Sequence, residues 1–187
     1  MIYSPAEDSY LIASELKKYV KGKSILDIGT GSGILALEAI KSKAISVLAA
    51  DINTEVISNL NNIKLKSNIA NLKVLKSDLF SNIPKESKFD IIVFNPPYLP
   101  LDNKEDKESQ LTTTGGKNGD EIILKFLKKS PVYLKKEGII LLLVSSLTPK
   151  EKIISLLKKQ SMNYQSISSK KLFFENLEVW KIQNENL

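Results

Sequence analysis

Residues 89–98 of the chain are Phe-Asp-Ile-Ile-Val-Phe-Asn-Pro-Pro-Tyr, and they give the strongest indication of its fold. The first six of these residues form an apolar run, which is typical of a strand buried on both faces of a parallel sheet. The two prolines fix φ and remove two backbone N–H donors, so the strand ends in a stiff turn. This turn presents carbonyls and the Asn95 side-chain oxygen as acceptors, beside the flat ring of Tyr98.

The acceptors of this turn suit a planar group that carries an NH2, either an amide or the exocyclic amine of a base. Methyl transfer to nitrogen is the chemistry that the turn indicates. An amide nitrogen is a poor nucleophile, because its lone pair is delocalised. We therefore expect catalysis to rest on orientation, with Asn95 and the Pro96 carbonyl accepting the two N–H bonds and Tyr98 stacking on the planar group. The predicted catalytic and substrate-binding residues are Asn95, Pro96, Pro97 and Tyr98.

On both sides of this stretch, short apolar runs alternate with longer amphipathic segments, which predicts a βαβ succession. The expected strands are residues 24–27, 45–51, 72–75, 89–94 and 138–144, and an antiparallel pair within 164–182. The expected helices are residues 7–19, 33–43, 54–66, 119–134 and 149–160. We expect Asn53 or Thr54 to cap the third helix and Pro149 to begin the last.

One segment, residues 99–118, is polar, charged and long for a connection inside a compact domain. Such loops are often functional. Because it directly follows the Asn-Pro-Pro-Tyr turn, we expect it to form a wall or lid of the substrate site. A surface excursion without such a role is the alternative.

A glycine-rich loop, residues 27–33 (Asp-Ile-Gly-Thr-Gly-Ser-Gly), joins the first strand to its helix. Glycines let the backbone turn tightly and approach a ligand. The dinucleotide-binding fingerprint would place its third glycine at position 34, which is Ile34 here, and no phosphate-binding Gly-Lys-Ser/Thr follows. The spacing of the glycines therefore matches neither of these phosphate-binding motifs.

Acidic residues stand at or just after the ends of three strands that we expect to be neighbours: Asp27 and Asp51 end two of them, and Asp78 follows the third. Open α/β sheets bind ligands at the carboxyl ends of their strands. Asp51 can accept both hydroxyls of a ribose, Asp78 can accept from an adenine amino group, and Leu79 can pack on the ring. Three carboxylates suit S-adenosylmethionine, which carries a sulfonium and an ammonium, and suit a pyrophosphate poorly. Asp27 or Asp51 taken alone could equally be a turn or cap residue.

Composition excludes several kinds of chemistry. The 187 residues contain no histidine and no cysteine, which rules out Ser-His-Asp and Cys-His mechanisms, disulfides and most zinc sites; we expect no metal. The length suits one domain, residues 1–187. No apolar run approaches the roughly 20 residues of a membrane span, and residues 1–8 show no secretion signal, so we expect a cytoplasmic protein.

Basic side chains outnumber acidic ones, 27 to 21, for a net charge of +6. The lysines are spread along the chain with few aromatics among them, which favours a solvated surface. A surface for nucleic acid or the ribosome is the alternative.

Taken together, the glycine-rich loop, Asp51, Asp78 and the 95–98 turn resemble the class I S-adenosylmethionine-dependent methyltransferases across most of the chain. The resemblance implies a Rossmann-like α/β fold, with a seven-stranded mixed sheet of order 3-2-1-4-5-7-6, strand 7 antiparallel and helices on both faces. It also implies that the cofactor is bound by Ser9, Asp27, Gly29, Gly31, Gly33, Asp51, Ile52, Asp78, Leu79 and Asn95.

Residues 3–11 narrow the resemblance, because they contain Pro-Ala-Glu-Asp-Ser. This is similar to the Pro-Ala-Glu-Asp-Thr/Ser signature of HemK-related protein-glutamine methyltransferases, and specifically to their short archaeal and eukaryotic branch. Residues 115–119 also fit the sequence pattern of that branch. The resemblance implies N5-methylation of the glutamine in the Gly-Gly-Gln loop of a class 1 translation release factor, with a small zinc-binding activator as partner. Ser9 occupies a position where threonine is commoner in the family, and it keeps the hydroxyl group. The resemblance says least about the loop after Leu99.

Two rival functions remain. A nucleic-acid amino-methyltransferase, acting on adenine N6 or guanine N2, would use the same turn, but the chain has no separate target-recognition domain and no aromatic-rich basic segment for a flipped base. A methyltransferase-like scaffold without activity is disfavoured by the intact turn and acidic set.

Overall fold

A seven-stranded sheet of order β3-β2-β1-β4-β5-β7-β6 forms the centre of the molecule. The computed structural model describes residues 5–101 and 113–185. Strands β1 to β5 pair in parallel, and β7 is antiparallel to both β5 and β6. The predicted order and the antiparallel strand are confirmed. The strands are β1 (Ser24–Ile28), β2 (Ser46–Asp51), β3 (Leu72–Lys76), β4 (Phe89–Phe94), β5 (Leu134–Ser145), β6 (Met162–Lys171) and β7 (Asn176–Asn184).

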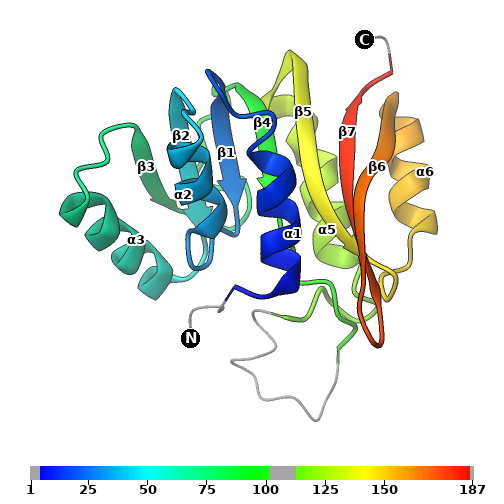
Figure 1. The fold of residues 1–187 in the computed structure, drawn as a ribbon. Helices are drawn as coiled ribbons and strands as arrows, with labels where there is room; N and C mark the ends of the chain where they lie inside the picture. The colour runs from blue at the N-terminus through cyan, green and yellow to red at the C-terminus, as the bar shows by residue number, and fades with distance from the viewer. Residues whose placement is uncertain (1–4, 102–112, 186–187) are drawn as a thin grey trace.

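Helices cover both faces of the sheet, so the molecule has three layers (Figure 1). One face carries α1 (Glu7–Leu16), α2 (Ile34–Lys41) and α3 (Thr54–Lys66), and the other carries α5 (Glu121–Lys129) and α6 (Glu151–Lys159). In β4, Ile91 and Val93 pack with the first group of helices, and Ile92 and Phe94 pack with the second. This burial on both faces is the reason why β4 is apolar throughout. No helix in the described ranges is long and apolar enough to cross a membrane.

Several predicted boundaries are wrong by a few residues. The helix expected over 119–134 starts at Glu121 and ends at Lys129; a short 3-10 helix (Ser130–Tyr133) follows, because Pro131 has no N–H to continue the α-helical pattern. Strand β5 therefore begins at Leu134, four residues earlier than expected. The last helix begins at Glu151, so Pro149 lies outside it, and α1 ends at Leu16 instead of residue 19.

The cap of α3 is Asn53, whose side chain accepts from the Glu55 N–H at 2.9 Å. This confirms one of the two expected caps.

The segments that carry the predicted site meet at one edge of the sheet. Because β1 to β4 are parallel neighbours, the residues that follow them lie together at their carboxyl ends. The start of α1 and the tip of the β6–β7 hairpin reach the same edge, which is the lower one in Figure 1.

Candidate active site

The glycine-rich loop passes closely between other parts of the core. Gly29, Gly31 and Gly33 all have positive φ, at 63°, 52° and 83°, which favours glycine. A Cβ at Gly33 would lie 2.6 Å from Leu60 Cδ1. The loop is also tied to the neighbouring strand, because the Thr30 N–H donates to the Ala50 carbonyl at 3.1 Å.

Asp27 is fully buried at the base of this loop. Its Oδ2 accepts from Thr30 Oγ1 at 2.6 Å and from the Ala36 N–H at 3.1 Å, whereas its Oδ1 has no hydrogen-bond partner in the described part of the chain. Burial raises the pKa of Asp27 to about 7, although both hydrogen bonds oppose that rise; nearby Asp51 adds to it. A cation beside Oδ1 would satisfy this oxygen and favour the charged carboxylate.

Asp51 is buried at the end of β2 and holds two backbone groups. Its Oδ2 accepts from the Gly31 N–H at 2.9 Å, and its Oδ1 accepts from the Asn53 N–H at 2.9 Å. Each carboxylate oxygen has a second lone pair that a ligand can use. Asp51 therefore shapes the glycine-rich loop and still offers acceptors at the edge of the sheet.

The turns after β2 and β3 add apolar and acidic groups to this edge. Ile52 is 61% exposed beside Asp51. Asp78 is exposed, and Leu79 is half-buried with a positive φ of 48°. The edge thus combines three carboxylates with two apolar side chains, which suits a cationic ligand with a flat ring.

Asn95 has the most informative contacts of the site. Its Nδ2 donates to Asp8 Oδ2 at 3.2 Å and lies 3.4 Å from Ser9 Oγ. A carboxylate accepts only, so Asp8 requires the NH2 side of the Asn95 amide and fixes its orientation. The other end, Asn95 Oδ1, is buried without a hydrogen-bond partner among the described residues. An unsatisfied buried acceptor is costly, and this one is available for an N–H donor.

Asp8 itself is held in place by its neighbour. It is 5% exposed in the first turn of α1, and its Oδ1 accepts from the Ser9 N–H at 2.5 Å and from Ser9 Oγ at 3.1 Å. Ser9, predicted to bind cofactor, is therefore placed beside Asn95.

The rest of the turn is braced by three other segments. Tyr98 donates through its hydroxyl to Glu175 Oε1 at 3.4 Å, and its carbonyl accepts from Thr148 Oγ1 at 3.3 Å. A Cβ at Gly119 would lie 2.4 Å from the Tyr98 carbonyl oxygen, and one at Gly115 would lie 2.7 Å from the Pro97 carbonyl oxygen. The glycines after the long loop thus let the chain pack directly against the turn.

Both ends of the predicted lid, residues 99–118, meet beside the turn. Leu99 donates to the Thr113 carbonyl and accepts from the Gly115 N–H, each at 2.9 Å. Residues 102–112 lie outside the described residues, so the predicted lid stays a prediction.

The structure gathers the predicted residues at one edge of the sheet and adds others that the sequence does not indicate. Asp8 precedes the predicted residue Ser9 within residues 3–11. The sequence does not indicate a role for it, because an acidic residue in the first turn of a helix is ordinarily explained by the helix dipole. Thr30, Thr148 and Glu175 gave no sequence signal, because their contacts arise only from the fold.

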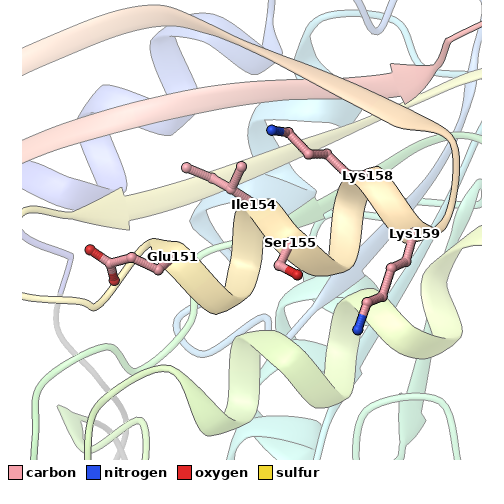
Figure 2. Close-up of a pocket in the computed structure, with 5 residues that line it drawn as sticks. All are labelled: Glu151, Ile154, Ser155, Lys158 and Lys159. Atoms are coloured by element: carbon pink, nitrogen blue, oxygen red, sulfur yellow. The ribbon is translucent and has the colours of Figure 1, made fainter.

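Two hollows among the described residues lie apart from this set. One, of about 460 Å³, is lined by Glu151, Ile154, Ser155, Lys158 and Lys159. Figure 2 shows that these side chains all come from α6 and point in different directions instead of converging. The other, of about 360 Å³, is lined by Pro5, Ser32 and side chains of α2. Neither is lined by a predicted site residue, so we place the candidate site at the polar edge.

The sheet order together with the glycine-rich loop, the acidic strand ends and the Asn-Pro-Pro-Tyr turn defines a class I methyltransferase. The chain matches the family model "Methyltransferase small domain" over residues 6–174. It belongs to that family and is a methyltransferase.

Relatives agree with this assignment. A "Putative protein N5-glutamine methyltransferase" of Methanocaldococcus jannaschii is 38% identical over 186 residues, which cover 97% of this chain and 92% of the relative. "Methyltransferase HEMK2" of Homo sapiens is 26% identical, with 96% and 88% covered. Among solved structures, the E. cuniculi Mtq2-Trm112 complex, described as responsible for methylation of the eRF1 termination factor, superposes with a TM-score of 0.75 at 24% identity and covers 98% of each chain.

Proposed function

We propose that this enzyme transfers a methyl group from S-adenosylmethionine to the N5 nitrogen of the glutamine in the Gly-Gly-Gln loop of a class 1 translation release factor. The observation that carries the proposal is the buried Asn95 Oδ1, which has no partner in the described part of the chain and whose orientation Asp8 fixes. A primary amide supplies the N–H donor that this oxygen lacks.

Orientation does the work that a strong base would otherwise do. General bases contribute about 10²–10⁴-fold, but the chain has no histidine to act as one. Asn95 Oδ1 and the Pro96 carbonyl accept hydrogen bonds from the two N–H groups of the target amide. These hydrogen bonds concentrate electron density on the amide nitrogen and orient its lone pair toward the methyl group. Orientation can contribute about 7–11 kcal/mol in well-aligned systems. The proton leaves to water after transfer.

The carboxylate of Asp8 strengthens this acceptor as well as turning it. A hydrogen bond that Asn95 donates to a carboxylate is charge-assisted. It shifts electron density within the Asn95 amide toward the side-chain oxygen. Asn95 Oδ1 then accepts more strongly from the target. Tyr98, held by Glu175 and Thr148, supplies the flat surface against which the planar amide lies.

The residues at the edge of the sheet fit the proposed cofactor. Asp27, whose buried Oδ1 has no hydrogen-bond partner among the described residues, matches a cationic group. Asp51 offers acceptors for a ribose, and Asp78 with Ile52 and Leu79 would hold the adenine. Ser9, the glycine-rich loop and Asn95 complete the proposed set. When bound, S-adenosylmethionine supplies an electrophilic methyl group on a sulfonium.

The relatives support the choice of substrate and partner. The name of the M. jannaschii protein specifies N5-glutamine, and the E. cuniculi complex is described as acting on eRF1 together with Trm112. We therefore propose that this chain acts together with a small activator protein, which the resemblance described above implies to be zinc-binding. We also propose that the enzyme acts in the cytoplasm.

Transfer of a labelled methyl group from S-adenosylmethionine tests the proposal. Release factor from the same organism is compared with a variant whose Gly-Gly-Gln glutamine is alanine, with and without the activator, and with DNA and RNA in parallel. Label on the native factor that disappears in the variant is the expected result. Label only on nucleic acid would show the rival amino-methyltransferase instead.

A further inference from the structure

Two adjacent phenylalanines are exposed at the tip of the β6–β7 hairpin. Phe173 is 92% exposed and Phe174 is 84% exposed. Their ring centroids are 4.6 Å apart and the rings are nearly perpendicular, at 84°. Other exposed apolar side chains, such as Ile45 and Leu65, have no exposed apolar residue next to them in the sequence, and single ones are common on protein surfaces. Two neighbouring rings in water, by contrast, suggest a surface that a partner covers.

The tip is fixed to the target turn. Glu175, the next residue after the two rings, accepts from Tyr98 at 3.4 Å and from Ser145 Oγ at 2.5 Å. The Leu172 N–H donates to the Glu175 carbonyl at 2.8 Å and closes the tip. Lys170 at the end of β6 pairs with Glu7 at the start of α1. The rings therefore lie at the same edge of the sheet as the Asn-Pro-Pro-Tyr turn. Figure 1 shows the tip of the β6–β7 hairpin at the end of the molecule where α1 begins.

We propose that Phe173 and Phe174 form a docking point for the protein that carries the target glutamine, where an apolar surface of that protein, outside its Gly-Gly-Gln loop, covers the two rings. This inference rests on the proposed function. The target turn alone grips one small planar amide, which gives little affinity for a macromolecule, and contacts remote from the reacting group commonly supply the rest. Exposed aromatic side chains are frequent anchors of such interfaces.

The charge around the tip favours a protein partner over a nucleic acid. Lys170 is paired with Glu7, and Glu175 carries a negative charge directly beside the rings, so the exposed Lys171 is a single further cation and not a cluster. Binding to a phosphate backbone depends on clustered unpaired cations. The perpendicular arrangement of the rings also differs from a platform on which successive bases stack.

A double variant, Phe173→Ser with Phe174→Ser, tests the docking point. Both side chains are exposed, so the variant should keep the melting temperature and the cofactor affinity of the wild type. We expect the KM for the intact release factor to rise by about tenfold or more, because burying one such ring contributes roughly tenfold to a hundredfold in affinity. The kcat/KM for a short peptide that spans only the Gly-Gly-Gln loop should not change.

Two further variants separate docking from a general surface effect. Phe173→Leu with Phe174→Leu keeps apolar side chains and should retain most of the affinity for the intact factor. Ile45→Ser removes an exposed apolar side chain, 67% exposed, from the opposite end of the sheet and should change nothing.

The outcomes distinguish this inference from the function on which it rests. An unchanged KM for the intact factor in the serine variant, with label still on glutamine, overturns the docking point and leaves the proposed function standing. Equal losses on factor and peptide also overturn it, since they place the effect in the target turn. A wild type that labels neither substrate contradicts the proposed function itself, and tip-dependent binding of RNA in its place would assign the rings to a nucleic acid.

Discussion

Asp8 and Asn95 are 87 residues apart in sequence and meet through a hydrogen bond of 3.2 Å. At the scale of single residues, this contact determines which end of the Asn95 amide faces the target. An amide has a donor end and an acceptor end, and without a fixed neighbour either could turn toward the substrate. The carboxylate removes that freedom, because it can accept only from the NH2.

Asp8→Asn should therefore lower kcat while it leaves cofactor affinity near that of the wild type. The new amide can donate as well as accept, so the orientation of Asn95 is no longer enforced. We expect a loss of about tenfold to a hundredfold, the range that an unsatisfied buried polar group produces. Steady-state kinetics and calorimetric titration with S-adenosylmethionine measure the two quantities.

Glu7→Gln is the matched control, because it removes a negative charge one residue away whose partner is Lys170. Exposed ion pairs contribute little, so its kcat should stay close to wild type. An equal fall of kcat in both variants would show that Asp8 acts through charge alone and not through the amide of Asn95.

Asp27 predicts a pH dependence of stability. Its pKa is about 7 in the folded protein against an ordinary 3.8, so between these values the folded state holds a proton that the unfolded chain has lost. The stability of the ligand-free protein should therefore fall as the pH rises through this window. Asp27→Asn removes the buried charge and should raise the melting temperature at about pH 8, with little effect at about pH 5.

The same residue should couple cofactor binding to proton release. A cation beside Asp27 favours the ionised carboxylate, so binding to the wild type near neutral pH should release a proton, and binding to Asp27→Asn should be weaker and lack that release. Calorimetric titration in buffers of different ionisation enthalpy measures the number of protons released on binding. Identical proton release in both proteins would remove Asp27 from the cofactor site.

At the scale of elements, the segment after the long loop supports the target turn through glycine. Gly119 has a φ of 86°, and a Cβ there would meet the Tyr98 carbonyl oxygen at 2.4 Å. That neighbour is backbone, so the turn itself would have to move. Gly22 has a similar φ of 73° but open space around its Cβ position, which makes it a natural control.

Gly22→Ala should cost about 1–2 kcal/mol of unfolding free energy, because alanine is strained at positive φ. Gly119→Ala should cost more, because its methyl group would also meet the Tyr98 carbonyl oxygen. Only Gly119→Ala should also lose methyl transfer, since only there does the new methyl group displace the turn. Denaturant unfolding and activity assays separate the two effects. A fully active Gly119→Ala protein would mean that the turn tolerates the shift.

The sequence predicted the elements better than their limits. Period and composition identified every strand of the described sheet. Central strands such as β4 are apolar because they are buried on both faces, whereas the exposed β6 was indicated only by β-forming residues without a helical period. The end of α5 was missed because Pro131 was placed inside the expected helix, although proline removes the required donor. Strand β5 was expected four residues too late, since Lys135, Lys136 and Glu137 at its start are exposed and polar.

At the scale of the whole molecule, the parallel order of β3, β2, β1 and β4 brings together residues that motifs had identified one at a time. The sequence could indicate the carboxylates and the turn because each follows a recognisable strand. It could not indicate Glu175 or Thr148 as supports of Tyr98, because those contacts depend on how β7 and the segment after β5 return to the same edge.

The role of Asn95 is best tested by the single-turnover rate of Asn95→Ala on the intact release factor, measured together with the dissociation constant of this variant for S-adenosylmethionine. If the Asn95 oxygen orients the target amide, the rate should fall by about a hundredfold or more, whereas the dissociation constant, to which Asn95 contributes one contact among several, should rise far less. Comparable losses in both quantities would contradict the claim and would make Asn95 a residue of the cofactor site alone.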